Sequence, residues 1–129
     1  MFVKLILMKI ARFEKISEKQ FRNDLKSLLN CDEDLYGFIA LPKRATKGSA
    51  GYDFCCPFEV TLRPDETIKI PTGIRCRIDE GYVLQIYPRS SFGFKYQMAL
   101  LNTVGIIDSD YYEADNEGHI IIADRKSVV

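Results

Sequence analysis

The sequence predicts a mainly β protein with one N-terminal helix. From residue 37 onward, short runs of β-branched and aromatic residues recur at intervals of about ten residues, as in all-β sandwiches and barrels. Turn-forming glycine, proline and aspartate separate these runs. Before them, a helical spacing of apolar residues predicts a helix over about residues 17–29.

The helix prediction depends on a start signal and an apolar stripe. Ser17 and Gln20 have the S-x-x-Q form of a capping box, in which the first side chain accepts from a backbone amide of the first turn. The stripe at i, i+4, i+7 and i+8 consists of Phe21, Leu25, Leu28 and Leu29. Lysine and arginine occupy the other face, so we expect the helix to pack on a sheet.

The strand predictions come from local patterns. The expected β runs are FIALP, YDFCCP, FEVTL, TIKIPTG, IRCRIDEG and YVLQIYP. Residues 59–62 and 67–70 alternate and flank the turn at residues 63–66, which predicts a hairpin. The opening run MFVKLILMKIA predicts another strand, because lysines interrupt it and it is too short to span a membrane. The acidic residues 30–36 predict a loop.

Length and charge limit the organisation and the partners. A chain of 129 residues predicts one domain, residues 1–129, with a strand and helix in residues 1–36 and a β core in residues 37–129. The 18 basic and 18 acidic residues give a net charge of zero. Broad electrostatic binding to nucleic acid or to an anionic membrane needs a basic excess, so we expect neither partner.

The cysteines and the single histidine favour structural roles. The cysteines are Cys31, Cys55, Cys56 and Cys76, and none forms a C-x-x-C pair. Adjacent residues of a strand point to opposite faces, so Cys55 and Cys56 are poorly placed to share a zinc ion. We expect the four cysteines to act as small buried apolar side chains, in a protein of the reducing cytoplasm. His119 is expected to be structural or solvent-facing rather than catalytic.

Three stretches combine polar side chains with tight turns. SAGYD places Asp53 after small residues that permit close backbone approach, although a plain turn aspartate fits too. PRSS sets Arg89, a planar fork suited to phosphate oxygens, beside two hydroxyls; the alternative is a capped turn with a surface arginine. NTVGIIDSDY places Asp108 at the end of an apolar strand, where it could accept a proton from water or simply form a polar turn.

In this order, AGYD, PRSS and NTVGIIDSDY resemble the first three of five motifs of the trimeric dUTP pyrophosphatase (dUTPase) family, over about residues 38–122. The resemblance implies a distorted jelly-roll or β-barrel fold. It also implies a hydrolase of nucleotide metabolism that converts dUTP to dUMP and pyrophosphate, with water attacking the α-phosphorus. Asp108 then resembles the base that activates this water, and Tyr111 the ring that packs on deoxyribose and excludes a 2′-hydroxyl. Asp110 is expected to be structural.

The resemblance implies roles for the remaining motif residues. The expected uracil-reading residues are Asn102, Gly105, Ile106 and Ile107, largely through backbone groups, with Ile121 as a further substrate contact. The expected phosphate clasp consists of Arg89, Ser90 and Ser91. Mg²⁺ is expected on the triphosphate oxygens without a direct protein ligand, and Asp53 as a second-layer carboxylate that holds a water on the metal.

The sequence also departs from the family pattern. Residues 112–117 lengthen the tip after Tyr111, and the fourth and fifth motifs cannot be located. We therefore expect a C-terminally truncated member that is weakly active or inactive in this form and homotrimeric when complete. Two other interpretations stay open: a dCTP deaminase-like enzyme, disfavoured by the Asp-x-Asp-Tyr ending, and a non-catalytic nucleotide-binding or regulatory fragment.

Overall fold

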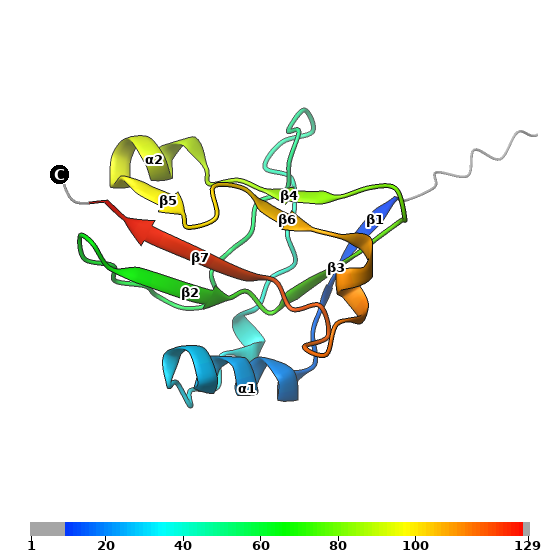
Figure 1. Cartoon of the computed structure of the whole chain (residues 1–129), viewed down its shortest axis with the longest axis horizontal. Coiled ribbons are helices and arrows are strands. Elements are labelled where there is room, and N and C mark those ends of the chain that lie inside the picture. The colour runs from blue at the N-terminus through cyan, green and yellow to red at the C-terminus, as the bar shows by residue number, and fades with distance from the viewer. Residues whose placement is uncertain (1–9, 128–129) are drawn as a thin grey trace, which may run out of the picture.

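Residues 10–127, described by a computed structural model, form seven short strands in three small antiparallel sheets (Figure 1). The strands are β1 (Ala11–Lys15), β2 (Thr67–Pro71), β3 (Ile74–Ile78), β4 (Leu84–Ile86), β5 (Met98–Leu100), β6 (Gly105–Ile107) and β7 (Ile121–Lys126). One sheet pairs β1 with β3, a second pairs β4 with β6, and the third has the order β2-β7-β5. Within this range, the mainly β architecture predicted from the sequence is confirmed.

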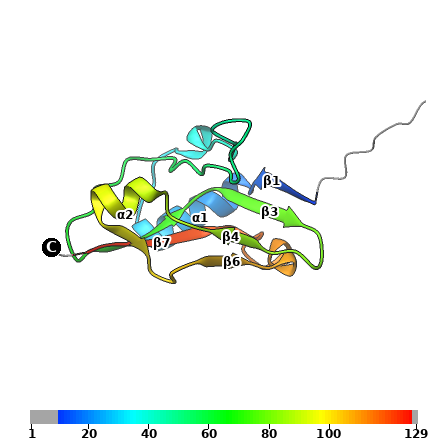
Figure 2. The ribbon, with the colours of Figure 1, turned by 90° about the horizontal axis from the view of Figure 1, so that it is seen from above.

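Helix α1 (Glu18–Leu29) begins and ends where its sequence signals predict. The Ser17 side chain caps it by accepting from the Gln20 amide at 3.2 Å. Asn30, in the left-handed conformation (φ 49°), ends it by donating its amide to the last turn. Phe21 and Leu25 of the apolar stripe are fully buried. The helix lies along β2, below the sheets in Figure 1 and behind β7 and β4 in Figure 2.

A second helix and two 3₁₀-helices interrupt the β structure. Helix α2 (Ser90–Tyr96) follows β4, where the sequence predicted only a turn. The 3₁₀-helices are η1 (Tyr36–Phe38) and η2 (Ser109–Glu113). Among residues 10–127, no helix is long and apolar enough to cross a membrane.

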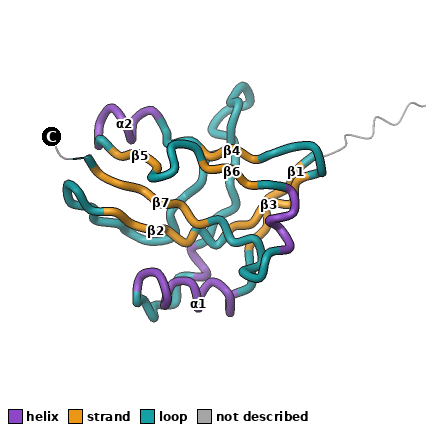
Figure 3. The backbone as a smooth tube through the Cα atoms, in the orientation of Figure 1, coloured by secondary structure: helices purple, strands orange, loops and turns teal. Residues whose placement is uncertain are grey.

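Three of the strand predictions are wrong, those for the runs FIALP, YDFCCP and FEVTL. Residues 59–62 form no strand; β2 pairs instead with β7, with Ile70 opposite Ile122, so the expected hairpin does not exist. Apart from Phe38, which ends η1, the runs FIALP and YDFCCP lie in the long loop of residues 39–66, visible in Figure 3, whose single β bridge joins Lys43 to Asp53. Alternation predicts which face of a segment is apolar but not which partner covers it. The strand predicted at the N-terminus falls mainly on residues 1–9, outside the described range.

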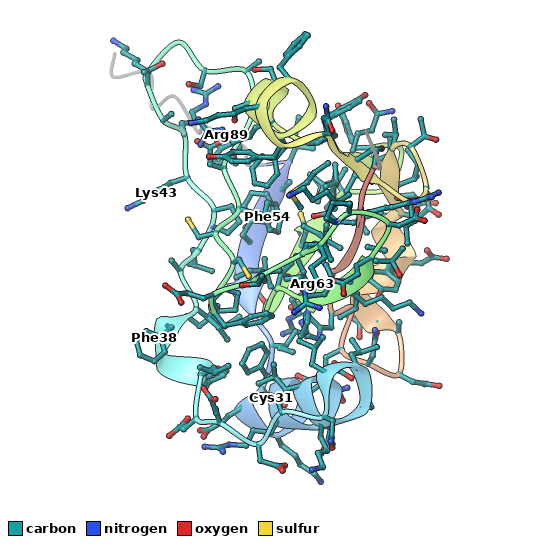
Figure 4. The ribbon with its side chains drawn as sticks, turned by 90° about the vertical axis from the view of Figure 1, so that its left-hand side faces the viewer. Cys31, Phe38, Lys43, Phe54, Arg63 and Arg89 are labelled. Carbon is teal, nitrogen blue, oxygen red and sulfur yellow. The ribbon has the colours of Figure 1, made fainter. Side chains whose placement is uncertain are left out.

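The core lies between α1, η1 and β3. Its buried members are Ile16, Phe21, Leu25, Ile39 and Ile74. Partly buried aromatic residues of the long loop, including Phe54 and Phe58, pack against it. Figure 4 shows Phe54 in the middle of the molecule, between Cys31 beside α1 and Arg89 near α2. The long loop is therefore held by side-chain packing rather than by strand pairing.

The prediction that the cysteines are buried holds for one of the four. Cys76 is buried in β3 and Cys31 is half-buried, whereas Cys55 and Cys56 are exposed. They are not in a strand, so the expected alternation does not bury either of them.

His119, expected to be structural or solvent-facing, is completely buried between α1 and the β2–β3 turn, so the solvent-facing alternative is wrong. The Gly73 amide donates to its Nε2 at 2.8 Å, and its Nδ1 lies 2.5 Å from Asp24 Oδ2. Since Nε2 accepts, the neutral ring carries its proton on Nδ1 and donates it to Asp24. Burial lowers the His119 pKa, an effect that the bond to Asp24 and the charge of Glu117 oppose.

We expect the free energy of unfolding to fall as the pH decreases below about 6.5, the ordinary histidine pKa. In this range the unfolded chain binds a proton that the folded chain, with its lowered His119 pKa, does not bind. One proton gives a slope of at most about 1.4 kcal/mol per pH unit. Urea unfolding between about pH 7.5 and 5.5 measures it, and His119→Gln should remove this contribution, because the chain has 1 histidine. An equal slope in both proteins would contradict the assignment.

Candidate active site

The candidate site is built on the β4–β6 pair. Leu84 lies opposite Ile107 and Ile86 opposite Gly105. Strand β6 has one partner among residues 10–127, so its other edge presents unpaired backbone amides and carbonyls. Such an edge can recognise a planar ligand through hydrogen bonds in a fixed direction.

Asp108 follows β6 directly, as the sequence predicted. Its backbone is extended (φ −78°, ψ 161°), and its carbonyl accepts from the Tyr111 amide at 3.2 Å, which begins η2. Its side chain does not cap that helix and is exposed. The carboxylate is thus held at a strand end and accessible to water. Asp110 lies within η2, so the strand does not continue and place it on the same face as Asp108.

The hydroxyl group of Tyr111 is fixed by two hydrogen bonds. It donates to the His119 carbonyl at 2.6 Å and accepts from Asn116 Nδ2 at 2.9 Å. The side chain is half-buried, which leaves part of the ring accessible. The neighbouring Tyr112 points elsewhere: its hydroxyl donates to Glu14 at 2.6 Å, and the Arg75 guanidinium lies 4.2 Å from its ring centroid.

Arg89, Ser90 and Ser91 lie at the start of α2 rather than in a turn. Arg89 is the residue before the helix, with an extended backbone (φ −65°, ψ 147°) and an exposed side chain. Its Nη1 is 3.9 Å from Asp53 Oδ2, so the structure brings together the charged residues of the first two motifs. Both line a cavity of about 620 Å³ whose other walls are mainly apolar, with Tyr52 and Phe92 among them.

The remaining predicted site residues lie in separate places. Asn102 is exposed in the turn before β6, and its carbonyl accepts from the Val104 amide at 2.7 Å. Ile121 begins β7 opposite Pro71, in a different sheet from β6. Among residues 10–127, no group of three histidine, cysteine or acidic side chains could hold a metal ion.

Sequence reasoning missed the polar residues that support Tyr111 and His119, chiefly Asn116 and Asp24. A signal for Asp24 existed: it stands three residues after Phe21, on the apolar side of α1, where a carboxylate needs a partner. It also missed Asp124 on β7, which lines the cavity of about 620 Å³ and a neighbouring one of about 410 Å³. Burial raises the pKa of Asp124.

The sequence profile of the dUTPase family matches residues 38–125, more than half of the chain. The chain belongs to the dUTPase family. Among curated dUTPases, it is similar to the deoxyuridine 5′-triphosphate nucleotidohydrolase of Lactococcus lactis, with 46% identity over 88 residues, which are 67% of this chain and 59% of the relative. The enzyme of the same name from Burkholderia mallei is 50% identical over 74 residues, which are 55% of this chain and 50% of the relative.

Solved dUTPase structures share the fold. The dUTPase from Streptococcus mutans has a TM-score of 0.67 at 30% identity, covering 90% of this chain and 79% of that one. The dUTPase of phage phi11 of S. aureus has a TM-score of 0.66 at 24% identity, covering 94% of this chain and 62% of that one, and shows the fold alone. The dUTPase-like jelly-roll fold is thereby confirmed. The aligned segments span 50–59% of the two curated dUTPases.

Proposed function

We propose that the protein carrying this sequence hydrolyses dUTP to dUMP and pyrophosphate. The observation that carries the proposal is the arrangement along β6: an open strand edge ends directly at the exposed carboxylate of Asp108, followed by the fixed ring of Tyr111. The family membership of residues 38–125 supports it. The activities named for the two curated relatives agree with it.

In this proposal, the unpaired edge of β6 at Gly105, Ile106 and Ile107, with Asn102 before it, reads the uracil ring. Cytosine presents exchanged donors and acceptors and would leave backbone groups unpaired, which is costly in a buried contact. The Tyr111 ring packs on the sugar and leaves no room for a 2′-hydroxyl. Ile121 of β7 is a further proposed contact.

For the chemistry, Asp108 takes a proton from the attacking water. The water oxygen bonds to the α-phosphorus, the bond from the α-phosphorus to the bridging oxygen breaks, and pyrophosphate leaves. Phosphoryl transfer depends mainly on positioning and charge stabilisation. Arg89, Ser90 and Ser91 would bind phosphate oxygens. Mg²⁺ on the triphosphate would neutralise charge, with Asp53 holding a water on it.

The β4–β6 register supports a site in which Asp108 and Arg89 come from different chains. Continued beyond the paired residues, the register sets Asp108 opposite Val83, six residues before Arg89. Six extended residues span roughly 20 Å. The α- and γ-phosphorus of one triphosphate are only a few bonds apart, which is a much shorter distance. We therefore propose that Arg89 comes from another copy, in a homotrimer.

An exposed apolar face supports assembly with another copy. Val83 and Tyr87 of the β4 segment and Ile106 of β6 are 44%, 61% and 51% exposed. Strand alternation sets Val83 and Tyr87 on the same face, and Ile106 lies opposite Gln85 between them. Exposed apolar side chains that gather on one face are typical of interaction sites.

The free exposed thiols of Cys55 and Cys56 support a reducing cytoplasm as the location.

The test compares dUTP, UTP and dCTP with Mg²⁺, measuring pyrophosphate and ammonia in parallel. We expect pyrophosphate and dUMP from dUTP, and much slower turnover of the other two nucleotides. Ammonia from dCTP would establish the deaminase alternative instead. No turnover of any nucleotide, with dUMP still bound, would establish a nucleotide-binding module.

A further inference from the structure

A continuous set of hydrogen bonds joins α1 to the hydroxyl of Tyr111. Asp24, on the buried side of α1, accepts from His119 Nδ1 at 2.5 Å. The backbone carbonyl of the same His119 accepts from Tyr111 Oη at 2.6 Å. His119 therefore links the helix to the tyrosine: its imidazole bonds to Asp24 and its carbonyl bonds to Tyr111. The position of the His119 backbone determines where the Tyr111 hydroxyl can bond.

The His119 side chain has no freedom to turn. It is fully buried, and the Gly73 amide donates to Nε2 at 2.8 Å while Nδ1 bonds to Asp24. A flip of the ring would exchange each nitrogen with a ring carbon, so the Gly73 amide would lose its acceptor and the Asp24 carboxylate would lose its donor. Both ring nitrogens thus determine one orientation, and the Phe21 ring packs beside it, with 6.1 Å between centroids.

The turn that carries His119 is attached to α1 at a second point. The Glu117 carboxylate accepts from the Ser17 amide at 3.1 Å and from the Ser17 hydroxyl at 2.5 Å, at the start of the helix. Within the turn, Asn116 donates to Tyr111 Oη at 2.9 Å and accepts from the Gly118 amide at 3.2 Å. The helix, outside the family match at residues 38–125, therefore holds a turn inside that match.

We propose that Asp24 and His119 are positioning residues for Tyr111, and that the anchoring of the tyrosine to α1 sets how strictly the site rejects ribonucleotides. This inference rests on the proposed function, in which the Tyr111 ring excludes the 2′-hydroxyl. A steric gate discriminates only when the ring cannot move away, because a displacement of about one ångström already loses much of a geometric effect. The ring has one hydroxyl by which the fold can hold it, and both of its described partners belong to the anchored turn.

The experiment measures dUMP and UMP affinities by calorimetry on the protein and on Asp24→Ala and Asp24→Asn. We expect Asp24→Ala to reduce the dUMP-to-UMP affinity ratio at least about tenfold, a plausible loss for a single steric contact. Asp24→Asn keeps an oxygen that can accept from Nδ1 and should restore most of the ratio. The matched control is Asp32→Ala, an exposed carboxylate 2.6 Å from Lys26 with no role in this turn. An unchanged ratio in folded Asp24→Ala would overturn the inference.

A second readout needs no nucleotide. The chain has 1 histidine, so nitrogen-15 spectra of its imidazole report His119 without ambiguity. We expect the Nδ1-protonated tautomer, and we expect the Tyr111 ring signals to shift or broaden in Asp24→Ala but not in Asp32→Ala. If the protein binds neither dUMP nor UMP but shows these spectral changes, the proposed function is contradicted, whereas the coupling of Asp24 to the Tyr111 ring is supported. Unchanged Tyr111 signals would overturn the coupling itself.

If Asp24→Ala does not fold, Tyr111→Phe tests the other end of the same contacts. It removes the hydroxyl that bonds to the His119 carbonyl and should lower the ratio while the Asp24–His119 pair stays intact. Tyr112→Phe is its matched control, since it loses an equally short bond to Glu14 on the other side of η2. Equal ratios in the two variants would overturn the inference.

Discussion

Asp108→Asn is expected to lower the rate of dUTP hydrolysis by roughly 10²–10⁴-fold, the usual contribution of a general base. The amide has the shape of the carboxylate but cannot take the proton of the attacking water. The substitution should leave the fold unchanged, because the Asp108 side chain is exposed and does not cap η2. Initial rates of pyrophosphate release with saturating dUTP and Mg²⁺ measure the effect, and dUMP affinity should change little.

The control for this experiment is Asp110→Asn. Asp110 is also exposed and lies two residues along the chain, but within η2 instead of at the strand end. It removes the same charge from almost the same place, so a general electrostatic effect of the negative charge would slow both variants alike. Equal losses in both variants, or no loss in Asp108→Asn, would remove Asp108 from its proposed role.

Gly118→Ala is expected to reduce the free energy of unfolding by about 2–5 kcal/mol. The residue has φ +70°, where a side chain costs about 1–2 kcal/mol. A Cβ there would also lie 2.7 Å from the Tyr111 carbonyl oxygen and 2.8 Å from Tyr112 Cα. Both are backbone atoms, so relief requires the turn to move, at an overpacking cost of about 1–3 kcal/mol. Urea unfolding monitored by circular dichroism measures the change.

Gly81→Ala separates the two contributions. Gly81 has φ +88°, but a Cβ there would meet no atom within 4 Å. Its substitution should cost only the conformational part, about 1–2 kcal/mol. If both variants lost the same stability, the close packing of Gly118 against η2 would contribute nothing, contrary to expectation.

The sequence predicted elements whose signals are local. The capping serine and the apolar stripe defined α1, and the end of the run VGII placed Asp108 after β6. Three short motifs in order indicated the family, because each one reflects a turn or strand end that needs particular residues. These features depend on neighbours a few residues away, which the sequence displays directly.

Pairing and support between distant segments could not be predicted in the same way. The partner of β2 is β7, more than fifty residues later, and no local pattern favours it over residues 59–62. Helix α2 escaped prediction because Gly93 and three aromatic residues give it weak helical propensity. The contacts of Asp24 with His119 exist only in the fold, although a carboxylate on an apolar helix face was a visible signal.

The attachment of α1 to the turn after η2 has a consequence for the order in which the chain can fold. The bonds from Ser17 to Glu117 and from Asp24 to His119 join residues 100 and 95 positions apart. On a ribosome that adds about 5–20 residues per second, the helix is made several seconds before its partners. During that interval its Asp24 carboxylate and the apolar side chains beside it stay without the turn that covers them. Contacts of such long range also slow folding of the released chain, because a large loop must close before they form.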